Sequence, residues 1–452
     1  MSLNKKVWIL HEVINLKRKH PDLWPDSGSL YSSWSDFVVT NQAATPHGWW
    51  VGGVASTQTS GYYWNQFTAS ISSYTLAIVS TIGRLNYNTE TISTSTKTSQ
   101  NKVFPGSTAS VDNNVAYVTG GSDNTPSSRV VYYYDQASSA YPYSIPGTNY
   151  GWKYTSNTSK INFGTAVESS VPSGNISVES GFMTGTETRQ NATNYGYLFG
   201  GYYEPSGGPL PNPYYPQSNS HSYIHKMLYS TESYTTISNK LPTGRDSCGA
   251  DGDKSTMCYI IGGYNGVGPT VSYITKFTFS TDSATPISNM SQELGDITLT
   301  SAPSSYGKAY SAGGNRSQSY TVGGWPIQPA SYSNYSKIIF STDTYSTISG
   351  ANLIAIPPAN DSRNIEGPGG GQGSRGYVKG VGGAANYGYF GGGWANFGWY
   401  IGPSLPNYLN IGSYNYNEIE KFEWATETNS WVPGASWSIT SFGGKGGTSF
   451  SQ

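Results

Sequence analysis

The stretch that decides the fold is MCYIIGGYNGVGPTVSYITKFTFSTDSATPIS, residues 257–288. Short apolar runs separated by turn-forming residues predict a strand that ends in two glycines, a loop, a second strand, a tight turn and a third strand. The first half returns along the chain as GWWVGG (48–53), AYVTGG (116–121), GYLFGG (196–201), SYTVGG (319–324) and GYFGGG (388–393). The chain therefore carries six copies of one unit.

The second half of the unit also recurs, and its spacing fixes the alignment. It is KFTFSTD in the quoted stretch and RLNYNTE (84–90), KINFGTA (160–166), KMLYSTE (226–232), KIIFSTD (337–343) and KFEWATE (421–427) elsewhere. A cation is followed three positions later by an aromatic residue and three further on by an acid, except that Ala166 replaces the acid in the second copy. Because stacked repeats share one architecture, this pattern overrides the roughly three domains that length alone would suggest.

The composition is that of a strand-rich protein and excludes several classes of partner. Of the 452 residues, 36% are apolar and 11% are charged, with 55 glycines and 38 tyrosines. This suits short strands joined by tight turns. A net charge of −1 gives no bulk attraction to nucleic acid or anionic lipid. No apolar run reaches the roughly 18 residues of a membrane span, so we expect neither a nucleic-acid partner nor membrane insertion.

Residues 1–35 lie outside the repeat. Their apolar residues recur at helical spacing, which predicts a short N-terminal helical arm with Val7, Trp8, Leu10 and Ile14 on its apolar face. Two roles stay open: the arm caps one face of the repeat domain, or it docks on a neighbouring subunit. Polar residues break the first apolar run, so we do not expect a secretion signal.

Each copy supplies four strands, because a further strand precedes each glycine-ended one. These first strands are predicted to begin at residues 37, 107, 180, 246, 308 and 375. Six units of four antiparallel strands predict an all-β fold, a six-bladed β-propeller, since a closed ring buries the faces and edges that an open row would leave wet. The paired glycines fit strand ends where chains approach closely.

The propeller is expected to span residues 36–452. Its blades are assigned to residues 37–106, 107–178, 179–243, 244–300, 301–374 and 375–435. Residues 436–452 hold one more apolar alternation, SWSITSF (436–442), which we expect to close the ring against the first blade. The alternative is that this segment reaches a neighbouring subunit.

The copies differ most between the second and third strands. From the second glycine to the cation of the third strand, the gaps are 31, 39, 25, 13, 13 and 29 positions, so the fourth and fifth copies are minimal. In a propeller these loops emerge on one face, and insertions gathered there mark a binding surface. Their aromatic and small polar residues suit contact with sugar rings or another protein; the alternative is that they only pack over the open end of the ring. The aromatic residues that we expect to bind are Trp64, Tyr150, Trp152, Tyr214, Tyr215, Trp394, Trp399, Tyr400 and Tyr408.

Catalytic and metal chemistry find little support in the sequence. His221 and His225 are four positions apart, but a loop-like sequence leads into them, which makes them a poor metal pair. A glycosidase needs two carboxylates in a cleft, and acids outside the S-T-[DE] turns are sparse. Within those turns we expect the acid to accept backbone N–H bonds locally. No catalytic residue, metal or cofactor is therefore assigned, and no enzymatic activity is expected.

The two cysteines, Cys248 and Cys258, bracket a turn-like ADGDKST whose centre, Asp253, is five residues from each. This symmetry predicts that they face each other across a hairpin. We expect reduced thiols in the core, since nothing indicates an oxidising compartment.

The segments GYLFGG, GYFGGG and K-[IFM]-x-[FY]-S-T-[DE] resemble the kelch-like repeat proteins common among virion structural proteins of tailed phages, particularly those of marine cyanobacteria. The match covers roughly residues 37–435. The resemblance implies a six-bladed kelch-like propeller that is assembled in the host cytoplasm into the virion, in multiple copies, within the tail, baseplate or tail fibre. Its partners would be other virion proteins and a host cell-surface glycan.

Two other classes of function stay open. One is a cellular lectin-like or protein-binding propeller, which would use the same aromatic loops. The other is a propeller glycosidase, which would depend on an acid in those loops.

Overall fold

The structure is a computed structural model that describes residues 47–58, 64–65, 68–69, 74–78, 81–96, 104–110, 113–122, 154–188, 195–203, 219–266, 270–316, 320–322, 325–327, 330–354, 376, 378–382, 385–397, 412–415, 418–436 and 448–451. All of them belong to one compact unit, Pro46–Gln452. The arm predicted for residues 1–35, with Val7, Trp8, Leu10 and Ile14, lies outside the described residues.

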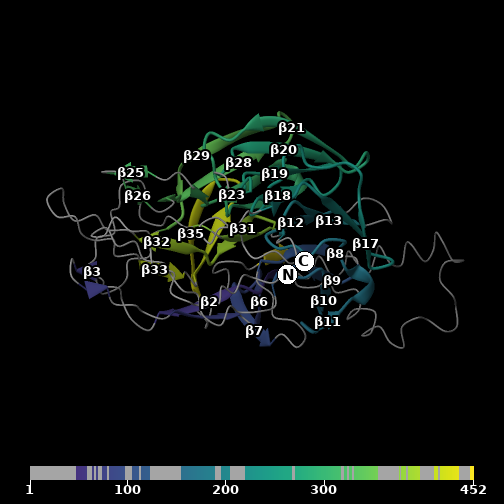
Figure 1. Cartoon of the computed structure of the whole chain (residues 1–452), viewed down its shortest axis with the longest axis horizontal. Coiled ribbons are helices and arrows are strands. Elements are labelled where there is room, and N and C mark those ends of the chain that lie inside the picture. The colour runs from purple at the N-terminus through teal and green to yellow at the C-terminus, as the bar shows by residue number, and fades with distance from the viewer. Residues whose placement is uncertain are drawn as a thin grey trace, which may run out of the picture. The chain divides into compact units, whose positions relative to one another are not determined.

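Six antiparallel sheets of four strands make an all-β, six-bladed propeller (Figure 1). From the innermost strand outward, the first three blades are β36 (Thr448–Ser451), β1 (His47–Val51), β6 (Thr81–Asn86) and β7 (Thr91–Thr96); β8 (Gly106–Ser110), β9 (Val115–Thr119), β10 (Thr158–Asn162) and β11 (Glu168–Ser170); and β12 (Thr184–Glu187), β13 (Tyr195–Phe199), β16 (Ile224–Leu228) and β17 (Ser233–Thr236). The other three are β18 (Gly249–Gly252), β19 (Met257–Ile261), β20 (Tyr273–Thr278) and β21 (Ser283–Asn289); β22 (Thr298–Ser301), β23 (Lys308–Ala312), β28 (Asn334–Ile339) and β29 (Thr344–Asn352); and β30 (Lys379–Val381), β31 (Tyr387–Gly391), β34 (Glu418–Glu423) and β35 (Thr428–Ser436). Helix is confined, in the described part of the chain, to the short 3₁₀ turns η2 (Pro172–Gly174) and η3 (Ser304–Tyr306).

The ring closes through the innermost strands. β8, β12, β18, β22 and β30 each lie beside the next in this order, and β36 lies beside both β30 and β8. β36 comes from the far end of the sequence and pairs with β1, with Gly48 opposite Ser451 and Val51 opposite Thr448. The first blade is thus built from both ends of the propeller sequence, which holds the ring shut.

The closing strand differs from the predicted one. Residue 436 ends β35, residues 437–442 lie outside the described part, and residues 448–451 make the pairing. The first strand predicted at residue 37 also lies outside the described residues, and β36 holds that position in the sheet. The apolar alternation of 436–442 favours a strand, but the innermost strands of this ring are short and rich in Gly, Ser and Thr, and TSFS fits them better.

Paired glycines end the second strand of every blade, and both residues of each pair have positive φ. In the third blade φ is 59° at Gly200 and 123° at Gly201, a conformation that other residues rarely adopt. A Cβ on Gly200 would also lie 2.1 Å from the carbonyl oxygen of Arg245, at the start of the next blade. The predicted close approach of chains at these glycines is therefore confirmed.

In the fifth blade the predicted alignment is wrong. The pair that ends the second strand is Gly313–Gly314, with φ of 65° and 118°. KAYSA at 308–312 is thus the second strand, and β22 is the first. SYTVGG belongs to an insertion in which β25 (Tyr320–Val322) pairs with β26 (Trp325–Ile327). Gly314 and Lys337 are 23 positions apart, so only the fourth blade is minimal.

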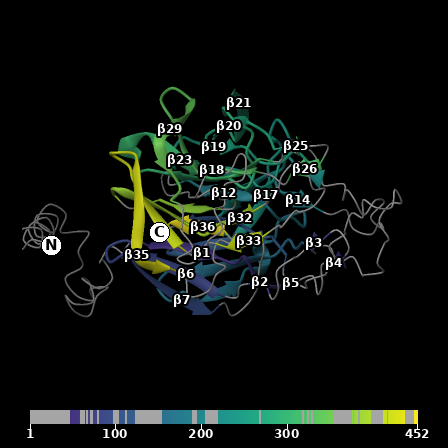
Figure 2. The same cartoon turned by 90° about the vertical axis from the view of Figure 1, so that its left-hand side faces the viewer.

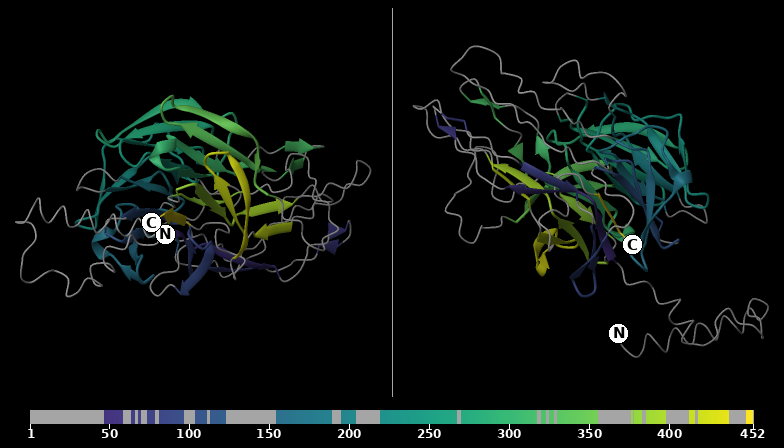
Figure 3. Two further views of the ribbon diagram at one scale, coloured as in Figure 1. Left: turned by 180° about the vertical axis from the view of Figure 1, so that it is seen from behind. Right: turned by 60° about the horizontal axis from the view of Figure 1, so that its bottom comes forward.

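The insertions between second and third strands continue as two-stranded β-ribbons. These are β2 (Val54–Gln58) with β5 (Tyr74–Ile78), β3 (Trp64–Asn65) with β4 (Thr68–Ala69), β14 (Tyr202–Tyr203) with β15 (Asn219–Ser220), β24 (Asn315–Arg316) with β27 (Ala330–Ser331), β25 with β26, and β32 (Trp394–Phe397) with β33 (Gly412–Asn415). All second strands end at the same end of the ring, so the ribbons leave from one face, and Figure 2 and Figure 3 show them gathered on one side. We call this the ribbon face, and we call the opposite end, with the turns between third and fourth strands, the turn face.

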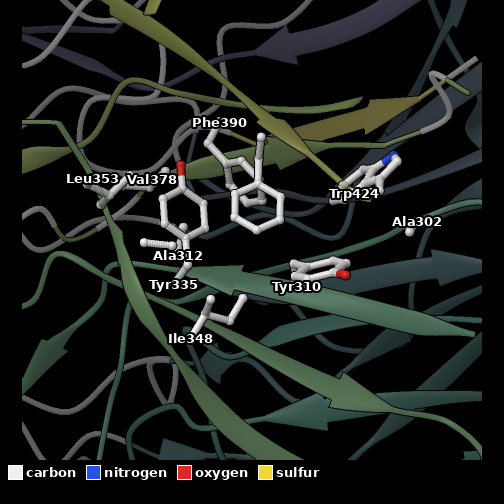
Figure 4. Packing of buried hydrophobic residues seen from close by; sticks show 11 residues of the cluster. Ala302, Tyr310, Ala312, Tyr335, Ile348, Leu353, Val378, Phe390 and Trp424 are labelled. Atoms are coloured by element: carbon white, nitrogen blue, oxygen red, sulfur yellow. The ribbon is translucent and has the colours of Figure 1, made fainter. Parts of the chain in front are cut away.

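The core consists of apolar layers between neighbouring blades. The layer between the fifth and sixth blades includes Tyr310, Tyr335, Ile348, Phe390, Phe422 and Trp424 (Figure 4). Second strands lie in the middle of these layers and are buried on both faces, as in YGYLF of β13. This explains why their sequences are nearly continuous in apolar residues.

The two cysteines do not face each other. In the hairpin of β18 and β19, Cys258 lies opposite Gly252, whereas Cys248 precedes the pair Gly249–Ile261 at the far end. The thiols are therefore offset along the sheet. Both are buried and free, and burial raises the pKa of Cys248 to about 11.

Removing residues 448–452 is expected to destabilise the whole propeller. Without β36, the innermost edge of the first blade leaves the backbone groups of β1 unpaired, which is costly when buried and promotes pairing with other chains. Circular dichroism should show a lower Tm or no cooperative transition, and size-exclusion chromatography should show oligomers. Deleting only Gln452, beyond the strand, is the control. A truncated monomer that unfolds at the wild-type temperature would show that β36 does not hold the ring.

Candidate functional site

The ribbon face is the first candidate interaction surface. Of the aromatic residues predicted to bind a partner, Trp64 lies in β3 and Trp394 in β32, so both belong to ribbons of this face. The other predicted residues, Tyr150, Trp152, Tyr214, Tyr215, Trp399, Tyr400 and Tyr408, lie outside the described residues, and their role stays a prediction. The insertion of the fifth blade, which the sequence alignment misses, adds two ribbons to the face.

A second feature joins neighbouring blades near the turn face at five of the six junctions. In the third blade, Tyr197 of β13 and Lys226 of β16 lie directly opposite each other. Both bind Asp282, in the turn between the third and fourth strands of the fourth blade. The Lys226 ammonium lies 2.8 Å from Oδ2, and the Tyr197 hydroxyl donates to Oδ1 at 2.9 Å. We call this cross-blade group of tyrosine, lysine and carboxylate a clasp.

Five of the six junctions carry a clasp. Their members are Tyr117, Lys160 and Glu232; Tyr197, Lys226 and Asp282; Tyr259, Lys276 and Asp343; Tyr310, Lys337 and Glu427; and Tyr389, Lys421 and Glu90. Their lysine-to-carboxylate distances run from 2.5 to 3.0 Å. The last clasp joins the sixth blade to the first across 331 positions of sequence.

An aromatic stack lies beside the clasp position at all six junctions. The aromatic residue three positions after the cation stacks on the second-strand ring of the preceding blade, with centroids 5.0 to 5.5 Å apart and interplanar angles of 6° to 28°. The pairs are Trp49–Phe163, Tyr117–Tyr229, Tyr197–Phe279, Tyr259–Phe340, Tyr310–Trp424 and Tyr389–Tyr87. Such pairs contribute about 0.5–1.5 kcal/mol each beyond their buried area.

The acid of the repeat has a different role from the predicted one. The expectation of N–H bonds within its own turn is wrong, because Asp282 and Asp343 accept hydrogen bonds from tyrosine and lysine of the preceding blade. These acids also have left-handed backbones, with φ of 47° at Asp282 and 54° at Asp343. That conformation costs a non-glycine residue roughly 1–2 kcal/mol, and the clasp offsets this cost.

Burial and hydrogen bonding favour the bonded protonation states of Tyr197, Asp343 and Glu427. Desolvation raises the pKa of Tyr197, and the negative charge of Asp282 raises it further, so the phenol stays a donor at neutral pH. Desolvation also opposes ionisation of Asp343 and Glu427. Hydrogen bonds from their tyrosine or lysine partners nevertheless hold the pKa of both carboxyls below the usual range. The carboxylates are therefore ionised acceptors at neutral pH.

The junction between the first and second blades has no clasp. Trp49 lies opposite Arg84 at the positions of tyrosine and lysine, and Ala166, with φ of 54°, stands in the place of the acid. The Arg84 guanidinium lies 5.5 Å from the centroid of the Trp49 ring, and its Nε donates to Ser93 Oγ at 3.4 Å. A cation–π contact thus stands where the other junctions have an ion pair.

The innermost strands line a small cavity. Lys254 bridges two carboxylates there: its Nζ lies 3.2 Å from Glu187 Oε1 and also contacts Asp251, which accepts the Ser301 backbone N–H at 2.7 Å. The cavity measures about 90 Å³, room for a few water molecules, whereas small-molecule sites usually measure about 300–1,000 Å³. We interpret these residues as structural. Sequence reasoning missed them, because single charges in short polar strands follow no repeat pattern.

His221 and His225 are buried in the third blade. His221 Nε2 lies 2.7 Å from Ser180 Oγ, and His225 Nδ1 lies 3.0 Å from Thr236 Oγ1. Burial, with a smaller repulsion from His225, lowers the pKa of His221 to about 3, and burial lowers the pKa of His225 to about 4, so both rings are neutral at pH 7. Within the described residues, no group of three or more His, Cys, Asp or Glu side chains could hold a metal ion.

A comparison of the chain with protein-family models finds no match, and a comparison with curated protein sequences finds none. In the part of the chain that the structure describes, no helix has the length and apolar character needed to cross a membrane. The repeat, the ribbons and the clasps are therefore the features from which a function can be inferred.

Glu427 is expected to make a pH-dependent contribution to stability. It accepts from Tyr310, Lys337 and a further lysine, Lys308, at 2.9 Å. Glu427→Gln should lower the free energy of unfolding at pH 7 by about 1.5–3 kcal/mol, the range for hydrogen bonds to a charged group. Because the folded pKa lies below the unfolded value of 4.5, the contribution is present above that pH and lost as pH falls through the folded pKa. The stabilities of wild type and variant in urea unfolding should therefore converge as the pH falls from 4.5 through the folded pKa of Glu427.

The matched control for this experiment is Glu423→Gln. Glu423 lies at the end of β34 and accepts from Thr426 in the same turn at 2.6 Å, without a cross-blade partner in the described residues. Its substitution should change the free energy of unfolding little. An equal penalty for Glu427→Gln at pH 3 and pH 7 would contradict an ionic clasp.

Proposed function

We propose that this chain is a non-enzymatic virion structural protein of a tailed phage, a propeller scaffold in the tail, baseplate or fibre apparatus. Its ribbon face would contact other virion proteins or a host cell-surface glycan. One observation carries the scaffold and binding parts of the proposal: insertions from five of the six blades leave one face of a ring, and aromatic stacks hold every junction of that ring.

The ring suits a scaffold because five of its six junctions keep the same clasp while its loops vary in length. The gap between second and third strands runs from 13 positions in the fourth blade to 39 in the second. The clasp distances stay within 2.5 to 3.0 Å over the same blades. Variable loops held by a rigid framework are the usual arrangement of binding surfaces in proteins.

The chemistry of the insertions favours recognition of a surface. The sixth-blade insertion begins WANFGWY, residues 394–400, and holds three aromatic residues besides Trp394 within that stretch. Aromatic rings provide large contact area with little loss of side-chain entropy, and neighbouring Asn, Ser and Gly residues provide adaptable hydrogen bonds. Both a sugar ring and a protein surface can use these groups.

The acids of the clasps support a structural role for these residues. A glycosidase needs one carboxylic acid with a raised pKa and a second carboxylate about 5–10 Å away. The clasp carboxylates are instead bound to lysine and tyrosine, and the pKa values of Asp343 and Glu427 are shifted downward. Those interactions suit structural ion pairs better than a proton donor.

The virion part of the proposal rests on the resemblance of the repeat to kelch-like phage proteins. In this setting several copies of the propeller would be assembled together, and the arm at residues 1–35 would anchor each copy on a neighbouring subunit. A cellular lectin-like propeller would use the same ribbon face. The virion protein and the cellular propeller are therefore distinguished by whether the chain is found in the phage particle.

Mass spectrometry of purified phage particles tests the location. Particles of the phage whose genome encodes the chain should contain the intact polypeptide in several copies, at a fixed ratio to the tail proteins. The ratio should persist after density-gradient purification. A chain abundant in the infected cell but lost from purified particles would favour the cellular propeller.

A glycan array tests the ribbon face. Trp399→Ala should weaken glycan binding about tenfold or more, because a stacking surface for the sugar ring is lost. The control is Thr281→Ala, at an exposed position of the turn face. Binding that Trp399→Ala leaves unchanged would move the carbohydrate site away from this loop.

A further inference from the structure

The junction between the first and second blades departs from the repeat at three positions together. Trp49 stands in place of tyrosine, Arg84 in place of lysine and Ala166 in place of the acid. The aromatic stack is kept, since Trp49 and Phe163 lie 5.5 Å apart at 28°. The apolar half of the junction is therefore intact, and only the polar half is altered.

The altered half keeps a cation that no acid among the described residues pairs with. Among the described residues, the Arg84 guanidinium contacts the Ser93 hydroxyl and the face of Trp49. Other charged groups of the same two blades have partners of their own: Lys160 binds Glu232, and Glu90 binds Lys421. Glu168 accepts a hydrogen bond from Ser159. The junction therefore carries one positive charge that these ion pairs do not neutralise.

An exposed apolar side chain directly follows the position of the missing acid. Val167, which follows Ala166, is 53% exposed, and it is one of two large hydrophobic side chains classed as exposed in the described residues. The other five blades have Ser or Thr at the equivalent position, as in Ser283 and Thr344. A second, independent departure from the repeat thus lies at the same turn.

We propose that this junction binds an acidic peptide segment of a partner protein on the turn face. Arg84 pairs with a carboxylate of the segment, and Val167 contacts an apolar side chain beside that carboxylate. The inference goes beyond the function proposed above, because it gives the propeller a second partner on the face opposite the ribbons.

The five clasps supply the geometry for such a carboxylate. At each of them an acid approaches the equivalent cation to within 2.5–3.0 Å. At the sixth junction the backbone has the same left-handed turn, but Ala166 ends in a methyl group, which leaves the cation to an acid from elsewhere. Arginine suits this task better than lysine, because its planar fork binds a carboxylate through two parallel hydrogen bonds while its face stacks on an aromatic ring.

Fluorescence anisotropy with a labelled Asp-Val-Asp-Val peptide tests the proposal. Wild-type protein should bind this peptide more tightly than the matching Asn-Val-Asn-Val peptide, and binding should weaken as salt is raised from about 0.05 to 0.5 M. Arg84→Ala should weaken binding of the acidic peptide about tenfold or more. Lys160→Ala, which removes a cation already paired in a clasp, is the matched control and should leave peptide binding unchanged.

A second variant separates a binding site from a simple structural stack. Ala166→Glu restores the internal acid, so it should abolish binding of the acidic peptide and raise the Tm, and the rise in Tm should disappear when Arg84→Ala is added. Peptide binding that survives Arg84→Ala or Ala166→Glu would overturn the proposal. It would be overturned equally by a wild-type protein that does not prefer the acidic peptide, since the Arg84–Trp49 contact would then be structural only. None of these measurements involves the ribbon face, so a failure of this proposal can be distinguished from a failure of the glycan experiment.

Discussion

The ring depends on the contact between a carboxylate of one blade and the lysine and tyrosine of the blade before it, which forms at five of the six junctions. Only 36% of the residues are apolar, and the outermost strands, such as SATPISN of β21, are largely exposed. A four-stranded sheet of this kind has too little apolar surface to be stable alone, so stability must come from its neighbours. At every junction between blades but one, a clasp with its ion pair lies beside an aromatic stack.

Closure of the ring makes these contacts cooperative. The clasp of Glu90 with Lys421 and Tyr389 is the same arrangement as the clasps between consecutive blades, although its members lie at opposite ends of the propeller sequence. Together with β36 on β1, it leaves no terminal blade with an uncovered face. Releasing any one blade then breaks two junctions instead of one, which is the advantage of a ring over an open row of repeats.

Features that recur at a fixed spacing can be predicted from the sequence. Contacts between residues of different blades cannot, because the partner lies a whole blade away. The cation, aromatic and acid columns are visible because every blade needs them at the same places, and they predict six blades. The role of the acid is hidden because its partner is remote: Lys226 and Asp282 are 56 positions apart. The fifth glycine pair is misassigned because SYTVGG in a ribbon imitates a strand end. The cysteine register is wrong because Asp253 accepts N–H bonds from Ser255 through Met257, which moves the turn two residues along.

The one irregular junction carries more information than the five regular ones. Random substitution would be expected to change the stacking positions as readily as the clasp positions. Trp49 and Phe163 still stack, however, while all three clasp positions differ. If the junction needed only stability, an apolar residue at position 84 would serve, since replacing ionic groups by well-packed apolar ones is often neutral or stabilising. Arg84 instead keeps the charge, in the form best suited to a carboxylate. A cation kept where its internal acid is gone is most simply explained by an acid that comes from another molecule.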